Sequence, residues 1–505
     1  MGALSDLIGT ARQSDAHRPV PRAIVDAAGW RRAAEALRDG RVTLLGLWGD
    51  RAAVHMAVLD EPAGDFIVLS LDCASRRFPS VGALHPPAIR LERAIRDLFG
   101  LEAEGAPDAR PWLDHGRWGV AQPLDHAPRP RHGDAAPYVF LRAEGESLHQ
   151  VAVGPVHAGI IEPGHFRFSA GGETVVRLEE RLGYVHKGIE KLMEGAGLDR
   201  AAQLAARASG DSTVAYVVAF ARAAEAALDL AVPPRAHWLR ALMAELERLA
   251  NHLGDIGAIC NDASFALMQA HCAVLRERVL RASDACFGHR LMRDCVVPGG
   301  VAVDLAPAGI AALHALRDEV RRRFPPLIAL YDNTTSLQDR TVGTGILRPE
   351  LARQFGAGGY VGRASDRAFD ARRSPGYAPY DQLTFTVPVR QRGDVDARVW
   401  IRIDEVGQSL DLVGQLLERL PSGAIRLPLP GNGRSAEGAA LVEGFRGDIL
   451  VWLRLAANGA VERCHLRDPS WFQWPLIEAA VEGNIIADFP LCNKSFNCSY
   501  SGHDL

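Results

Sequence analysis

Two short segments far apart in the chain carry most of the residues that could do chemistry. The first reads Arg207-Ala-Ser-Gly-Asp-Ser212, and the second is the final stretch Ser495-Phe-Asn-Cys-Ser-Tyr-Ser-Gly-His-Asp-Leu505. Simple packing could explain the serines, but the carboxyl and imidazole groups favour a functional cavity, because a merely structural core would hold apolar residues there. A serine oxygen is a hard ligand and does not act as a soft anionic ligand for a transition metal.

The composition is that of an ordinary globular chain. Its 505 residues are 48% hydrophobic and 23% charged, which is enough to bury large cores in two or more domains. A net charge of -4 gives no general attraction for nucleic acid, and no such partner is expected. No run approaches the roughly 20 apolar residues that cross a bilayer. We therefore expect a cytoplasmic chain that reaches a membrane only through partner subunits.

The eight cysteines contain no Cys-x-x-Cys pair. This argues against an iron-sulfur cluster or a structural zinc held by this chain alone. We expect the cysteines to be small buried apolar side chains. A cluster shared with a partner stays open, because Cys492 and Cys498 lie near the second segment.

The first 120 residues predict a small α+β domain. A helical pattern begins the domain, three β-rich runs follow, and a second helical pattern ends it. These elements are expected at 27–38, at 42–48, 53–59 and 66–71, and at 89–98.

A Pro- and Gly-rich linker over 121–146 leads to a larger, mainly helical body with small β-sheets over 147–505. Strands are expected at 147–153, 166–169 and 173–178, and helices at 201–230, 235–260, 264–291, 397–420 and 474–481. The turn Ala457-Asn-Gly459 predicts a hairpin within 439–466, and an extended tail ends the chain.

Several motifs carry a family resemblance. The sequences Gly154-Pro-Val-His-Ala-Gly-Ile-Ile-Glu-Pro-Gly-His165 and Gly183-Tyr-Val-His-Lys-Gly-Ile-Glu-Lys191 resemble conserved segments of nickel-iron hydrogenase large subunits and of the quinone-site (49 kDa-type) subunit of respiratory complex I. Further blocks of the same family are Glu245-Leu-Glu-Arg-Leu-Ala-Asn-His252, Pro298-Gly-Gly300 and Gly393-Asp-Val-Asp-Ala-Arg398. In the first domain, Glu92-Arg-Ala-Ile-Arg-Asp-Leu-Phe-Gly100 looks like the signature of the 30 kDa-type subunit of complex I.

The resemblance implies that a metal centre has been lost. Hydrogenase large subunits carry Arg-x-Cys-Gly-x-Cys and, near the C-terminus, Asp-Pro-Cys-x-x-Cys. The matching positions here are Ser209, Ser212, Ser499 and Gly502. The chain thus resembles group 4 (formate-hydrogenlyase-type) large subunits without the nickel-binding cysteines, and no metal is expected in it.

The resemblance also implies candidate proton-handling residues. His157 and Glu162 match the loop in which related proteins place groups that face the buried reaction cavity, and both residue types suit a proton path. The alternative is that Glu162 caps a turn and His157 binds backbone groups. Arg207 and Asp211 are expected to shape the vacated cavity, in part as a charged pair.

The resemblance also bears on a candidate quinone site and on the interface with an iron-sulfur partner subunit. Complex I has a quinone-binding tyrosine where this chain has Gly210, and Tyr216 follows on the next helix, so an ordinary quinone site is not favoured. Quinone stays a candidate ligand. His186, Lys187 and His252 match or approach the interface with an iron-sulfur small subunit, although His252 also suits a core position. No nucleotide-binding loop is visible, so any NADH would bind another subunit.

These expectations define the leading hypothesis. The chain is a subunit of a complex I-like or hydrogenase-related oxidoreductase on the cytoplasmic face of the inner membrane, with antiporter-like membrane subunits as partners. Electrons arrive from the partner's iron-sulfur cluster and are coupled to proton or ion translocation. The alternative is a non-catalytic scaffold of such a complex. An active nickel-iron hydrogenase and an ordinary NADH-quinone oxidoreductase are the least favoured hypotheses.

Overall fold

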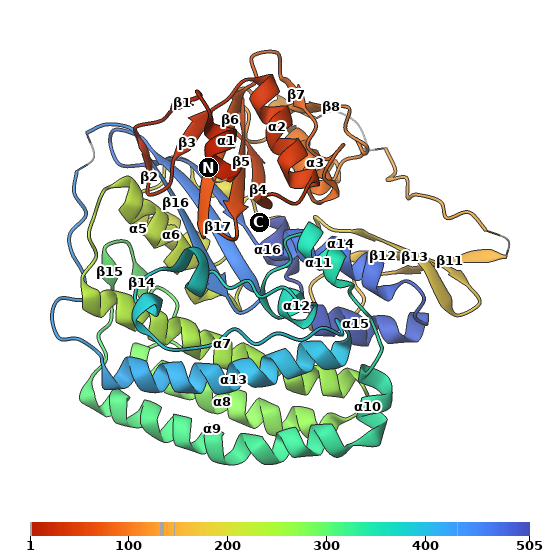
Figure 1. The fold of residues 1–505 in the computed structure, drawn as a ribbon, viewed down its shortest axis with the longest axis vertical. Coiled ribbons are helices and arrows are strands. Elements are labelled where there is room, and N and C mark those ends of the chain that lie inside the picture. Colours follow the sequence, from red (N-terminus) through yellow and green to blue (C-terminus); the bar gives the residue numbers. More distant parts are fainter. Residues whose placement is uncertain (1–2, 132–135, 146, 432) are drawn as a thin grey trace.

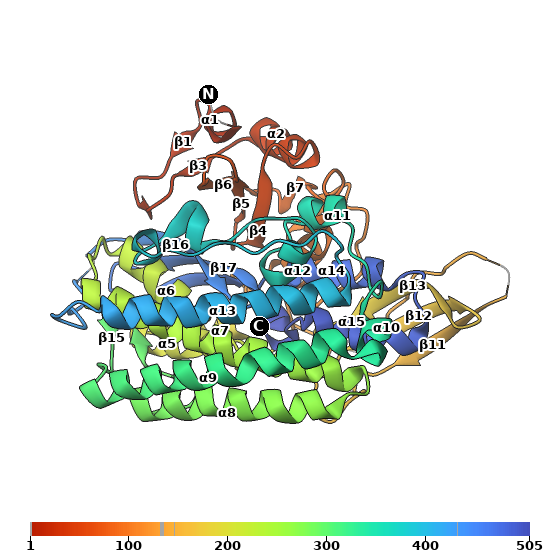
Figure 2. The same ribbon diagram turned by 60° about the horizontal axis from the view of Figure 1, so that its bottom comes forward.

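The computed structural model describes residues 3–131, 136–145, 147–431 and 433–505. Residues 132–135 and 146 of the expected linker lie outside the described residues. Figures 1 and 2 show an N-terminal unit seated on one side of a larger body, with the helices α8 and α9 on the opposite side. The mixed α+β class expected from the sequence is confirmed.

The N-terminal unit is a five-stranded sheet in the order β1-β3-β6-β5-β4, with helices α2 and α3 packed beside it. Asp26 caps α2, because its carboxylate accepts a hydrogen bond from the Gly29 N–H at 2.7 Å. The elements are α1 Ala3–Ile8, β1 Arg12–Gln13, β2 His17–Arg18, β3 Arg22–Ile24, α2 Ala27–Arg38, β4 Thr43–Gly49, β5 Ala53–Asp60, β6 Asp65–Asp72, β7 Arg77–Pro79, α3 Ile89–Phe99 and β8 Glu102–Glu104.

A strap with the two short strands β9 (Val120–Ala121) and β10 (Arg129–Pro130) leads to a three-stranded antiparallel sheet. This sheet, which contains β11 (Leu148–Val153), β12 (His165–Gly171) and β13 (Thr174–Arg181), projects from the side of the body (Figure 1). The loop that joins β11 to β12 carries His157 and Glu162.

The body is a helical bundle beneath a second sheet. The long helices α7 (Pro234–Asp262), α8 (Ala266–Phe287), α9 (Pro307–Asn333) and α13 (Val395–Glu418) form the bundle, and α6 (Thr213–Ala227) lies between it and the strands. The sheet has the order β18-β17-β16-β2. Its strands in the body are β16 Ala436–Gly444, β17 Gly447–Leu455 and β18 Val461–Arg467. Shorter elements are α4 Ile189–Met193, α5 Leu198–Ala205, β14 Val296–Val297, β15 Gly300–Val301, α10 Thr335–Thr341, α11 Pro349–Gln354, α12 Gly359–Ala364, α14 Ser470–Val481, α15 Phe489–Phe496 and α16 Tyr500–Asp504.

Two sequence-based expectations were wrong. The helix expected over 201–230 is interrupted between α5 and α6, because the Ser-Gly-Asp-Ser run prefers turns and caps to a helix interior. The tail is helical instead of extended: α15 ends at Asn497 in the left-handed conformation (φ +47°), and Ser499 caps α16. Both departures occur in the two segments that carry the candidate chemistry.

The apolar core of the N-terminal unit continues into the body. Trp30 and Phe99 belong to the same buried cluster as Phe166, Tyr360 and Trp471. The eight cysteines are buried and unpaired, as expected. Among the described residues, the structure has no helix that is both long enough and apolar enough to cross a membrane.

Candidate functional site

The two segments singled out in the sequence meet in space. Residues 206–212 connect α5 to α6, while Ser499 caps α16 by accepting a hydrogen bond from the Gly502 N–H at 2.9 Å. The hydroxyl oxygens of Ser209 and Ser499 lie 2.8 Å apart, and both side chains are buried. Positions at which the resembling family has thiolates are therefore neighbours in this chain.

A directed chain of hydrogen bonds leaves this serine pair. Ser209 donates its hydroxyl proton to Oδ1 of Asp211 at 2.7 Å. Because a hydroxyl has only one proton to donate, Ser499 is the donor in its contact with Ser209. The chain of hydrogen bonds runs from Ser499 through Ser209 and ends at the Asp211 carboxylate.

Arg446 occupies the space beside Asp211. It lies in the turn between β16 and β17, is only 4% exposed, and donates from both Nη atoms to the Asp211 carboxylate, from Nη1 to Oδ1 at 2.7 Å. It also donates to the Ser212 hydroxyl at 3.3 Å. Burial opposes ionisation of Asp211, but the Arg446 charge outweighs it and the pKa of Asp211 falls to about 2. Asp211 is therefore an anion at neutral pH.

Gly502, the fourth altered position, faces Asp468. A Cβ on Gly502 would overlap Oδ2 of Asp468 and approach the Ser499 hydroxyl at 2.9 Å. The Tyr216 hydroxyl donates to the same Oδ2 at 2.6 Å. Burial and the nearby Asp468 charge raise the pKa of Tyr216, which stays protonated. The hydroxyl of the tyrosine that follows the first segment is thus engaged inside the protein.

Glu247 lines the same outer cavity as Asp211, and its role was not predicted from the sequence. This glutamate of α7 accepts hydrogen bonds from the Val214 N–H at 2.6 Å and the Ala215 N–H at 3.1 Å, at the first turn of α6. Burial raises the pKa of Glu247 to about 8. Glu247 and Asp211 both line an outer cavity of about 210 Å³. The sequence signal for Glu247 was its place in the family block Glu245-Leu-Glu-Arg-Leu-Ala-Asn-His252, and the Asn251 amide of the same block donates to the Asp211 carbonyl.

The β11–β12 loop contacts the outer side of α16. Glu162 is exposed, and its Oε2 accepts a hydrogen bond from the Ser501 N–H at 2.9 Å. The Nε2 of His157 lies 3.4 Å from the Tyr500 hydroxyl. The structure therefore places these two residues next to the second segment but on its outer side, and not inside a buried cavity.

His186 and Lys187 lie on the same side of the site. The Lys187 ammonium donates to the carbonyl of Ala208 at 2.8 Å, directly before Ser209. The His186 ring donates from Nδ1 to the carbonyl of Asp504 at 2.7 Å. Lys187 is exposed and His186 is half-buried, so both can be reached from the surface.

Two expected placements differ in the structure. Arg207 does not pair with Asp211. Its guanidinium donates to both carboxylate oxygens of Asp294 at 3.0 Å on the surface, and Arg446 is the partner of Asp211. His252 is fully buried and lies 2.7 Å from Glu405, so it occupies the core position and does not reach the surface of the chain. Arg446 and Asp468, which were also missed, come from distant strands and have no local signal.

The side chains at this centre do not fit a nickel-iron group. Three of the four positions present hydroxyl groups that bind Asp211, Arg446 or the Gly502 N–H, and the fourth has no side chain. The thiol of the adjacent Cys498 is buried, which raises its pKa, so it is not a thiolate. Among the described ranges, no group of three or more His, Cys, Asp and Glu residues is arranged to hold a metal ion.

Comparison with known proteins agrees with the motifs. The model of the respiratory-chain NADH dehydrogenase 49 Kd subunit matches residues 262–431, and that of the 30 Kd subunit matches residues 23–129. Formate hydrogenlyase subunit 5 of Escherichia coli (strain K12) is 32% identical over 86% of this chain and 78% of its own length. An NADH-quinone oxidoreductase protein of the C/D type, from Phocaeicola vulgatus, is 28% identical over 80% of this chain and 83% of its own length.

A solved structure has the same fold. A chain of the membrane-bound sulfane sulfur reductase, an archaeal respiratory membrane complex, superposes with a TM-score of 0.67 at 24% identity, over 72% of this chain and 100% of that one. The 32% identity to formate hydrogenlyase subunit 5 over most of both chains decides the relationship. This chain therefore belongs to the family that joins the 49 Kd subunit of complex I to the large subunits of membrane-bound hydrogenases, here fused to a 30 Kd-type unit.

Proposed function

We propose that the chain is a subunit of a membrane-associated, complex I-like or hydrogenase-related oxidoreductase, and that it handles protons where its relatives hold nickel and iron. Electrons come from an iron-sulfur cluster in a partner subunit and are coupled to proton or ion translocation by antiporter-like membrane subunits. The chain itself binds no metal. It lies on the cytoplasmic face of the inner membrane through these partners.

The hydrogen-bonded chain from Ser499 through Ser209 to Asp211 carries this proposal. It joins the two altered motifs with groups that exchange protons, and it ends beside Glu247 at a cavity that opens outward. Glu247 has a pKa near 8 and can donate or accept a proton at neutral pH. Simple loss of a metal centre would not require such an ordered series of groups.

The partner surface is proposed to include the β11–β12 loop. Ile160 is 99% exposed and Val156 is 82% exposed at its tip, and apolar side chains in this position suit burial by another subunit. Lys187 lies on the same side of the centre. Glu162 and His157 are proposed to exchange protons between this interface and α16. A quinone is a candidate acceptor only if it binds at this interface, because the Tyr216 hydroxyl is engaged with Asp468.

A non-catalytic scaffold is the second candidate, and one observation favours it. The ion pair between Arg446 and Asp211 fills the centre and ties it to the β16–β17 turn. Such a pair could serve only to hold the body together after the metal was lost. The two roles differ in whether the carboxylate of Asp211 is needed for turnover or only for stability.

The test is Asp211→Asn in the complex isolated from its native membrane, with Arg207→Gln as the matched surface control. The proton-handling role predicts that Asp211→Asn lowers turnover by about 100-fold or more in assembled complex, while Arg207→Gln does not. Full turnover of assembled Asp211→Asn and Glu162→Gln complexes would support the scaffold instead. Stoichiometric nickel in the complex would contradict both candidates.

A further inference from the structure

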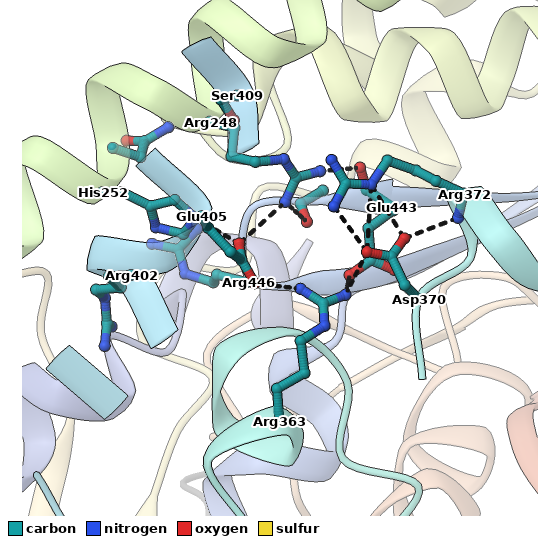
Figure 3. A network of polar contacts seen from close by, with 12 residues as sticks. Arg248, His252, Arg363, Asp370, Arg372, Arg402, Glu405, Ser409, Glu443 and Arg446 are labelled. Atoms are coloured by element: carbon teal, nitrogen blue, oxygen red, sulfur yellow. Dashed lines mark hydrogen bonds and ion pairs between the residues drawn. The ribbon is translucent and has the colours of Figure 1, made fainter. Parts of the chain in front are cut away.

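A closed network of charged side chains lies in the body, apart from the serine centre (Figure 3). It contains four carboxylates, three guanidinium groups and one imidazole, and none of these residues is more than 3% exposed. These residues come from the helices α7, α12 and α13, the strand β16 and the short segment 370–372. The members are Glu245, Arg248, His252, Arg363, Asp370, Arg372, Glu405 and Glu443.

The guanidinium groups join the carboxylates into one unit. Arg372 contacts Glu245 at 2.9 Å and Asp370 at 2.7 Å. Arg363 contacts Asp370 at 3.0 Å and also pairs with Glu405 and Glu443. Arg248 completes the unit through Glu245 at 3.5 Å and Glu405 at 3.7 Å. Every carboxylate in the network therefore has an arginine partner.

The charges of this network do not balance. Four carboxylates face three guanidinium groups, and burial lowers the pKa of His252, so its ring is neutral. With every carboxyl group ionised, the network would hold one unmatched negative charge away from water. An unmatched buried charge is strongly unfavourable, and a buried acid normally avoids this state by binding a proton.

The charged groups around the network do not supply the missing positive charge. The neighbouring charged groups already have partners outside the network. Arg446 pairs with Asp211, and Arg467 pairs with Asp448. Arg402 pairs with Asp255, and Lys494 also approaches this carboxylate. Arg222 stacks on the Tyr377 ring at 4.7 Å, and among the described residues it forms no ion pair with a carboxylate of the network.

Glu443 is the carboxyl group best placed to hold the proton. It shares Arg363 with Asp370 and Glu405, whereas Asp370 is bound by two guanidinium groups. Burial and the Asp370 charge raise the pKa of Glu443 to about 7, while the pKa values of Glu245, Asp370 and Glu405 are lowered by their arginine partners against the effect of burial. We propose that this network is a binding site for a single exchangeable proton, held on Glu443.

The proton site is connected to the serine centre through one turn. Arg248 donates to the carbonyls of Glu443 at 3.0 Å and Gly444 at 3.1 Å, and Arg446 follows in the same turn. Arg446 in turn holds Asp211. Loss of the Glu443 proton therefore adds a negative charge on the strand that leads into the turn of Arg446. The site can be detected without any electron-transfer activity, so its test is independent of the proposed function.

Infrared spectroscopy across a pH series tests the proposal on the full chain, because a protonated carboxyl group gives its own C=O band. Other buried acids, among them Glu247, also give such bands, so the Glu443 band is the one that Glu443→Gln removes from the wild-type spectrum. In the wild-type chain this band should disappear with a midpoint near pH 7 as the pH rises. Asp370→Asn is the sharper variant. It removes the excess negative charge, so Glu443 should ionise and the band should disappear from the neutral range.

The matched control is Glu247→Gln, which removes a different buried acid and should keep the Glu443 band. A Glu443→Gln chain with an unchanged set of bands would overturn the proposal. A folded Asp370→Asn chain that kept the band would also overturn it, because charge balance would then not be the cause. If Asp370→Asn does not fold, Glu405→Gln makes the same change in charge and is judged by the same outcome.

Discussion

Ser209 and Ser499 are 290 positions apart in the chain, and their hydroxyl oxygens lie 2.8 Å apart in the core. The contact joins the segment before α6 to the residue that caps α16. It therefore stabilises both segments of the centre. Removing either hydroxyl should lower the free energy of unfolding and also disturb any proton transfer through the centre.

Ser499→Ala should lower the free energy of unfolding by about 1–2 kcal/mol. The change removes the cap of α16 and leaves the Gly502 N–H without its acceptor. Urea denaturation measures the loss. Ser422→Ala, at an exposed position in the loop before β16, is the control and should change stability by less than about 0.5 kcal/mol. Equal losses in the two variants would contradict the capping role.

Gly502→Ala should destabilise the chain by about 1–3 kcal/mol, because the new methyl group overlaps the Asp468 carboxylate that binds Tyr216. Gly407→Ala is the matched control on α13, where a Cβ meets no atom within 4 Å. That change should stabilise the helix by about 0.5–1 kcal/mol. The prediction is wrong if thermal unfolding shows the same sign for both substitutions.

Glu247→Gln should flatten the pH dependence of stability. Burial raises the pKa of Glu247 from its ordinary value to about 8, so the folded state holds this proton more tightly than the unfolded state. The contribution is fully present below the unfolded pKa and is lost as the pH rises through about 8. Urea midpoints between about pH 5 and pH 9 should fall less in Glu247→Gln than in the wild type.

The control for this titration is Glu350→Gln, at an exposed position in the first turn of α11. It should reproduce the wild-type slope with pH. A wild-type slope in Glu247→Gln would show that this carboxyl group does not hold a proton in the folded chain.

Ile160→Asp should weaken assembly without changing the stability of the isolated chain. The side chain is 99% exposed, so the substitution breaks no contact within the chain, but it would place a charge in the proposed partner interface. Co-purification of the complex from the membrane measures assembly. Leu267→Asp, at a 53% exposed position on α8, is the control and should assemble normally. Normal assembly of Ile160→Asp would exclude the loop tip from the interface.

Local patterns predicted most elements of the fold. The helix expected at 27–38 is α2, the three β-rich runs match β4, β5 and β6, and the Asn-Gly turn joins β17 to β18. These elements follow from periodicity and turn residues, which act over a few positions. The interruption before α6 was missed because apolar spacing outweighed the turn preference of the Ser-Gly-Asp-Ser run. The tail was predicted to be extended because its Ser, Asn and Gly residues are poor helix formers, and its two helices are short.

The site was predicted only in part for a different reason. The family motifs located Ser209, Ser499 and Asp211, but no local pattern relates Asp211 to Arg446, 235 positions away. The pairing depends on how the β16–β17 turn meets α6. For the same reason, the sequence left His252 open between an interface and a core position, and the structure places it in the core with Glu405 of α13 as its partner.

The strand β2 has a consequence for synthesis of the chain. Its residues His17 and Arg18 pair in parallel with Glu437 and Gly438 of β16, at the edge of the sheet in the body. The ribosome makes β2 first, and at about 5–20 residues per second its partner emerges roughly tens of seconds later. During that interval β2 has no strand partner. The N-terminal unit is thus joined to the body by a strand pairing that can form only after residue 438 has been made.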